Sequence, residues 1–185
     1  MWSSASAFTN DPRSTSLERL VPGWIHIGSD DGKIAVWGQD KLLSSEMDLL
    51  PHVVTFRGRL LMWLAGERTR RIGVTEGHSE WVTLENISND LVDSMAQEEI
   101  TLHPLVAPIT PEALSDFDAV IFGNPWLTVS EAEAEALLSW NRAGGGLLIL
   151  GLEWSWRAYH PDDPMGMTYP IRSLTMDLNL TFYDG

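Results

Sequence analysis

The chain has 185 residues, a net charge of −14 at neutral pH and an isoelectric point near 4.5. This length suits one domain with a substantial core, and 44% hydrophobic with 21% charged residues is a globular composition. A surface this acidic repels phosphate backbones and anionic lipids, which argues against nucleic acid and membrane partners. No apolar run approaches the roughly 20 residues of a transmembrane helix, and no secretory signal is recognisable. We expect a soluble protein whose compartment the sequence leaves open.

The sequence contains no cysteine. Disulfides, thiolate nucleophiles and cysteine metal sites are therefore excluded. The H-E-x-x-H pattern of zinc peptidases is also absent, and HPDDP at 160–164 is more typical of a turn than of a metal site. No G-x-G-x-x-G run follows the first strand of the predicted sheet, so a dinucleotide fingerprint is missing. We expect no metal and no other cofactor.

The N-terminal part of the chain divides into two segments. Residues 1–20 are polar and rich in Ser and Thr, which predicts a loosely attached arm before a single domain over 21–185. Two β-rich runs follow, WIHIGS at 24–29 and KIAVWG at 33–38, on either side of a DDG turn. This spacing predicts an N-terminal β-hairpin.

Beyond residue 50, helical stretches alternate with short apolar strands. The clearest helix begins at a capping box formed by Ser130 and Glu133 and ends at the glycine run 144–146. The other predicted helices are 51–65 before Gly66, 81–95 and a segment around 171–177. The predicted strands are 71–76, 99–105, 118–123, 147–151 and 180–184. This alternation predicts an α/β fold, a flavodoxin-like doubly wound parallel sheet, with the N-terminal hairpin as an extension.

Three loops that follow predicted strands combine aromatic and polar side chains: GHSEW, NPW and LEWSW. Because the carboxyl ends of parallel strands share one edge, we expect these loops to form a Trp-lined rim that binds a ligand. Aromatic faces beside carboxylates and an amide suit a glycan, a peptide or a protein partner. The competing interpretation is that the Trp side chains close the core beneath the loops. The candidate binding residues are His78, Glu80, Trp81, Asn124, Trp126, Glu153, Trp154 and Trp156.

The stretch from VIFGNPW through AEALLSWNRAGGGLLILGLEWSW resembles the class I glutamine amidotransferase-like domain found beside M60 (enhancin-like) metallopeptidases. It is also similar to the corresponding domain of the TRPM8 channel-associated factors. The run FRGRLLMWLAGERTRRIGV fits an earlier part of that domain, and the resemblance extends from Leu20 to the C-terminus. The resemblance implies an amidotransferase-like fold and a binding or scaffolding role beside another domain or subunit, such as a peptidase.

Class I amidotransferases carry a nucleophilic Cys at the third position of a G-x-C-x-G elbow. The resemblance places Gly151 at the first position and Glu153 where the Cys would stand. A carboxylate cannot form the thioester, and no His-Glu pair follows it to activate a nucleophile. We therefore predict a non-catalytic binding module. The alternatives are an atypical hydrolase with Glu153 as general base and His78 or Glu80 as its partner, or a structural or regulatory subunit of a larger assembly.

Overall fold

A computed structural model describes the chain over residues 24–27, 32–67, 70–151, 153–163 and 167–177. The predicted arm at 1–20 and the predicted strand at 180–184 lie outside these residues. Among the residues described, no helix is both long and apolar enough to cross a membrane.

Six strands form one sheet in the order β1-β2-β6-β5-β3-β4. β1 pairs antiparallel with β2, and the remaining pairs are parallel. The strands are β1 (Trp24–Ile27), β2 (Lys33–Trp37), β3 (Arg71–Glu76), β4 (Thr101–Val106), β5 (Ala119–Gly123) and β6 (Gly146–Leu150). The run β4-β3-β5-β6 is the 2-1-3-4 order of a flavodoxin-like sheet, with β2 in the fifth place. The predicted fold class and the N-terminal hairpin are confirmed.

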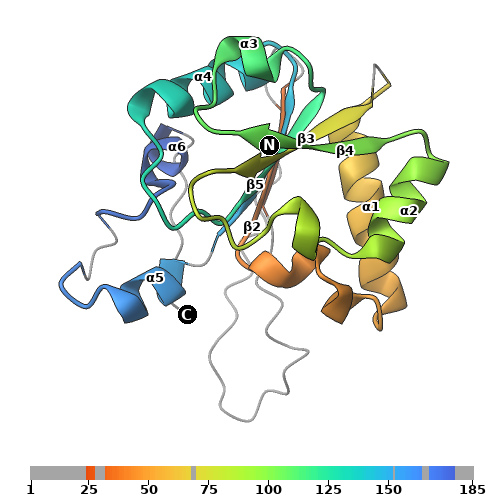
Figure 1. Cartoon of the computed structure of the whole chain (residues 1–185), viewed down its shortest axis with the longest axis horizontal. Helices are drawn as coiled ribbons and strands as arrows, with labels where there is room; N and C mark the ends of the chain where they lie inside the picture. Colours follow the sequence, from red (N-terminus) through yellow and green to blue (C-terminus); the bar gives the residue numbers. More distant parts are fainter. Residues whose placement is uncertain (1–23, 28–31, 68–69, 152, 164–166, 178–185) are drawn as a thin grey trace.

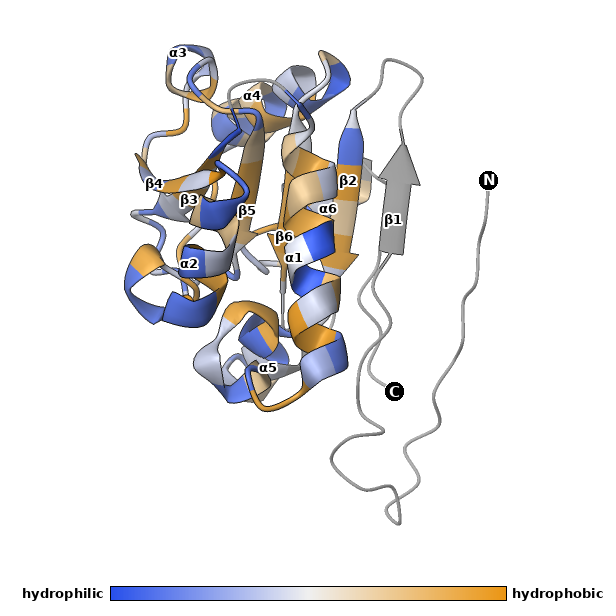
Figure 2. Ribbon diagram, turned by 90° about the vertical axis from the view of Figure 1, so that its right-hand side faces the viewer, coloured by the Kyte–Doolittle hydropathy of each residue, from blue (hydrophilic) through white to orange (hydrophobic). Residues whose placement is uncertain are grey.

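Helices cover both faces of the sheet (Figure 1). They are α1 (Pro51–Ala65), α2 (Asn89–Gln97), α3 (Pro111–Leu114), α4 (Glu131–Arg142), α5 (Glu153–Tyr159) and α6 (Arg172–Asp177), with short 3₁₀ turns at Asp40–Leu43, Ser45–Met47 and Leu84–Asn86. α1 and α2 pack on one face, whereas α3, α4 and α6 pack on the other. α5 lies near the end toward which the arrow of β2 points (Figure 2). This is the carboxyl edge of the sheet.

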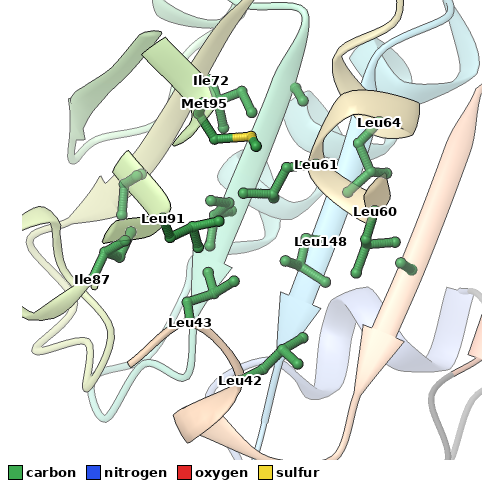
Figure 3. Close-up of a cluster of buried hydrophobic side chains, with 14 of the residues drawn as sticks. Leu42, Leu43, Leu60, Leu61, Leu64, Ile72, Ile87, Leu91, Met95 and Leu148 are labelled. Carbon is green, nitrogen blue, oxygen red and sulfur yellow. The ribbon is translucent and has the colours of Figure 1, made fainter. Parts of the chain in front are cut away.

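The core consists of two apolar clusters, one on each face of the sheet. Ile121 and Leu148 belong to the cluster that α1 and α2 cover, and Figure 3 shows Leu148 within it. Their chain neighbours Phe122 and Ile149 belong to the cluster beneath α4 and α6. This alternation is the two-residue period of a strand, and both faces are apolar because both are covered.

The helix predicted over 81–95 was wrong at its start. α2 begins at Asn89, and the Ser88 side chain caps it by accepting a hydrogen bond from the Leu91 N–H at 3.2 Å. The preceding residues form a loop with its own capping box, in which Thr83 and Asn86 bond each other's backbone N–H groups. Short polar side chains that bond nearby backbone compete with helix formation, and here they hold residues 81–88 in a loop.

Candidate binding site at the carboxyl edge of the sheet

Backbone hydrogen bonds join the loop after β3 to the loop after β5. The N–H groups of Trp126 and Leu127 donate to the carbonyl of His78 at 2.9 and 2.8 Å. In return, the Trp81 N–H donates to the Asn124 carbonyl at 3.2 Å. The Val82 N–H donates to the carbonyl of Gly123 at 2.9 Å. These bonds continue the sheet edge into the loops and bring two of the three predicted segments together.

The aromatic side chains of the three loops form a continuous row. The ring centroids of Trp81 and Trp126 are 6.0 Å apart, and those of Trp126 and Trp156 are 5.5 Å apart. Tyr159 meets Trp126 edge to face at 5.4 Å, and His160 stacks on Trp156 at 3.7 Å. Most of these separations and tilts are those that aromatic pairs favour. We call Trp81, Trp126, Trp156 and Tyr159 the aromatic row.

Exposure divides the aromatic row into a base and two exposed ends. Trp156 is buried in the core, with 8% of its surface exposed, as the competing interpretation predicted for the Trp residues. Trp126 is half-buried above it. Trp81 and Tyr159 are 56% and 72% exposed, and both touch Trp126. An external ligand can therefore reach the ends of the row but not its base.

His78 and Glu80 lie inside the rim rather than on it. The His78 ring is 3.0 Å from Glu133 Oε1 through Nε2 and 3.4 Å from Glu80 Oε1 through Nδ1. The other oxygen of Glu80 accepts from the N–H groups of Gly77 and His78, at 3.0 and 2.9 Å. His78 is 6% exposed, and the Glu80 side chain 1%. Both residues hold the loop that carries Trp81.

Glu133 reaches this site from the first turn of α4. Its Oε1 also accepts the Ile109 N–H at 3.0 Å, and its Oε2 accepts from the backbone N–H and hydroxyl of Ser130. Burial raises the pKa of the Glu133 carboxyl, but these hydrogen bonds and the charge of His78 outweigh burial and lower the pKa to about 2. Glu133 is therefore a carboxylate at neutral pH. The sequence indicated its capping role but not its contact with His78.

Asn124 is buried, with 2% of its surface exposed. Its Oδ1 accepts the Tyr169 hydroxyl at 3.1 Å, so the predicted ligand-binding amide is occupied within the protein. Its backbone has a φ of +56°, and Ser79 in the neighbouring loop has a φ of +54°. Asn tolerates this left-handed region better than most residues, which explains its place at the sharp turn after β5.

An open hollow of about 420 Å³ lies at the end of β3 and is lined by the same loop that carries Trp81. Its lining residues are Glu76, Gly77, Ser79, Glu80, Thr83 and Glu85. Carboxylates dominate the hollow, but no group of three or more His, Asp or Glu side chains suited to a metal ion occurs among the described residues.

Two predicted site residues, Glu153 and Trp154, have side chains outside what the structure describes, although α5 begins at Glu153. Sequence reasoning missed Tyr159, because the stretch after β6 was interpreted as an elbow and not as a helix. Trp156 and Tyr159 are three residues apart, the spacing that places two side chains on one helical face. Assigning a helix there would have identified Tyr159.

Comparisons with known proteins give one structural similarity. No family model matches the chain, and no curated protein matches it. Among solved structures, the fold is similar to a chain in "Structure of IMPa from Pseudomonas aeruginosa in complex with an O-glycopeptide". The similarity has 11% sequence identity and a TM-score of 0.46, and it covers 69% of this chain and 14% of that one. At this level it says nothing about the site or ligand of the present chain.

Proposed function

We propose that the chain is a non-catalytic binding module that recognises a glycan, peptide or protein partner through the carboxyl edge of its sheet. The observation that carries the proposal is the aromatic row, whose exposed ends Trp81 and Tyr159 flank the half-buried Trp126. Large aromatic side chains exposed together at this edge of an α/β sheet are typical of recognition surfaces. The buried contact of His78 with Glu133 ties the loop that carries Trp81 to α4.

Two features support a non-catalytic role. The sequence has no Cys, so an amidotransferase thioester has no thiolate to form it. For the hydrolase alternative, His78 or Glu80 would have to partner Glu153, the general base. Both ring nitrogens of His78 face carboxylates within the protein, and the buried Glu80 side chain is bonded to the Gly77 and His78 backbone. In this arrangement both candidate partners are engaged by other groups of the protein.

The amidotransferase-like relationship forms part of the same proposal. β6 ends at Leu150, and α5 begins at Glu153, which is the strand–turn–helix arrangement of a nucleophile elbow. With Glu153 in the place of the nucleophile, the site would be a degenerate one on a single domain over 21–185. Such a module would act beside another domain or subunit, a peptidase being the case that the sequence resemblance implies.

Arrays of glycans and peptides, probed with labelled protein, test the proposal. We expect Trp81→Ala and Tyr159→Ala each to weaken binding of the array hits by about tenfold or more, since aromatic anchors often contribute 1–2 kcal/mol or more. Both side chains are exposed, so the variants should unfold at nearly the wild-type temperature. Met176→Ala, a 59% exposed position on α6, is the matched control and should bind normally. Hits retained in full by the Trp81→Ala/Tyr159→Ala double variant would refute the proposal.

A further inference from the structure

The charges of this protein are unevenly distributed along its sequence. Between Arg71 and Arg142 there is no Lys or Arg, so every formally charged side chain in this span is Asp or Glu. The span includes the loops after β3 and β5, which carry Trp81 and Trp126. Lys33, at the start of β2, and Arg71, at the start of β3, lie at the opposite, amino edge of the sheet. The loop after β3 carries Glu80 and Glu85, and the loop after β5 carries no formal charge, so neither loop brings a Lys or Arg to the aromatic row. On α5, Arg157 lies between Trp156 and Tyr159 in the sequence.

Two of the carboxylates beside Trp81 are available to a ligand. Glu85 is exposed and Glu76 is half-buried, and both line the hollow formed by the segment that carries Trp81. Within the described part of the chain, neither takes part in an ion pair. Glu80 differs, because its side chain is buried and bonded to the Gly77 and His78 backbone. The hollow therefore presents two uncompensated carboxylates at its surface.

An exposed indole beside free carboxylates suits a guanidinium or ammonium group. Arg stacks on the face of Trp and at the same time donates hydrogen bonds to carboxylates in its own plane. Leu127, which is 55% exposed and shares the His78 carbonyl with Trp126, offers an apolar contact for the neighbouring residue of the ligand. A neutral sugar would use Trp81 but not the charge, and an acidic ligand would be repelled.

We propose that the aromatic row binds a cationic peptide segment, with an Arg or Lys side chain held between Trp81 and the carboxylates of Glu76 and Glu85. This inference rests on the proposed function and names the ligand class for the same surface. The proposed ligand is a basic peptide, and the experiment must distinguish it from a neutral glycan.

The test uses the full chain, ¹⁵N-labelled, and three probes observed by NMR. The probes are the peptide acetyl-Leu-Arg-Gly-Arg-Leu-amide, the same peptide with citrulline in place of both arginines, and the neutral disaccharide N,N′-diacetylchitobiose. We expect the arginine peptide to shift the indole N–H of Trp81 and the amides of Gly77 and Ser79, at the mouth of the hollow. The citrulline peptide should bind about tenfold more weakly, because it keeps the shape but loses the charge. Raising NaCl from 20 to 300 mM should weaken the arginine peptide several-fold.

Charge variants test which carboxylates bind the arginine peptide. Glu76→Gln/Glu85→Gln should reduce arginine-peptide affinity to that of the citrulline peptide. Glu67→Gln/Glu98→Gln removes the same charge from a second hollow, at the amino edge beside Lys33, and should leave affinity unchanged. Equal binding of the two peptides, or no loss in Glu76→Gln/Glu85→Gln, would overturn the inference. Shifts at Trp81 with diacetylchitobiose alone would also overturn it, while leaving the proposed binding function intact.

Discussion

Glu133 connects the first turn of α4 to two other parts of the structure. One oxygen caps the helix through Ser130, and the other accepts the Ile109 N–H before α3 and faces His78 beneath the rim. A capping box in an isolated helix needs only the first of these contacts. The additional partners make this side chain a junction between the helix and the binding surface, and they lower its pKa to about 2.

We expect Glu133→Gln to destabilise the fold at pH 7 by about 2–3 kcal/mol, since it removes a charged acceptor from three donors. The pKa of Glu133 is lower in the folded than in the unfolded chain, so its stabilising effect is fully present above pH 4.5 and is lost as the pH falls toward 2. Urea unfolding of wild type and variant between pH 7 and pH 2.5 measures this. The difference should narrow steadily below pH 4.5. Glu135→Gln, an exposed position on the same helix, should change stability by about 0.5 kcal/mol or less.

If the difference in unfolding free energy between wild type and Glu133→Gln stayed constant from pH 7 to pH 2.5, Glu133 would act through its shape and not through its charge. A full effect from Glu135→Gln would point instead to the helix dipole of α4, which both carboxylates share.

At the scale of elements, two glycines should respond to the same substitution in opposite directions. A Cβ added to Gly146, the first residue of β6, would lie 2.4 Å from the backbone oxygen of Leu64 in α1. Gly58, inside α1, has only the Met95 methyl nearby, at 3.4 Å. We expect Gly146→Ala to cost about 2 kcal/mol or more, because backbone would have to move. Gly58→Ala should stabilise by about 0.5–1 kcal/mol, because Ala has the higher helix propensity.

Guanidinium unfolding of the two single variants beside wild type shows whether Gly146→Ala lowers the free energy of unfolding and Gly58→Ala raises it. If Gly146→Ala were neutral, α1 would have to be able to shift away from β6. If Gly58→Ala were destabilising, the packing of Met95 between α1 and α2 would be tighter than the 3.4 Å contact indicates.

Elements that carry their own local signal could be predicted from the sequence, and the others could not. α4 was predicted from its capping box and apolar stripe, and β5 and β6 from short apolar runs between turn residues. The pairing of β2 with β6 was not predicted, because nothing within Lys33–Trp37 specifies a partner more than a hundred residues away. α5 was missed because its seven residues are too short to show helical periodicity clearly.

In the candidate site, too, some features could be predicted from the sequence and others could not. That Trp81, Trp126 and Trp156 would come together followed from their places shortly after predicted parallel strands, whose carboxyl ends share one edge of the sheet. Their exposure did not follow. Trp156 lies on α5 with its ring against the core, whereas Trp81 lies in a loop with its ring in solvent. Burial depends on the direction in which each element leaves the sheet, and that direction is a property of the assembled fold.

At the scale of the whole molecule, the net charge of −14 is a stability term as well as a recognition signal. Like charges on one compact body repel each other, and salt screens the repulsion over distances of about 8–10 Å at physiological ionic strength. Here the repulsion should be strongest in the span without Lys or Arg, which supplies α2, α3 and α4 up to Asn141. Along α2, Asp90 and Asp93 stand three residues apart, where like charges oppose the helix.

Asp93→Asn should therefore stabilise the protein at 20 mM NaCl by about 0.2–0.5 kcal/mol, and the gain should largely disappear at 500 mM, where charges are screened within a few ångströms. Glu67→Gln is the control, because Glu67 shares the hollow at the amino edge with Lys33 and Arg70, and its loss should leave stability unchanged or lower it. Thermal unfolding of both variants at 20 and 500 mM NaCl measures these effects.

A gain in stability for Asp93→Asn that survives at 500 mM would mean that helix propensity or a local hydrogen bond caused it. An equal gain for Glu67→Gln would mean that total charge matters and its position does not, which would also weaken the charge argument for a cationic ligand at Trp81.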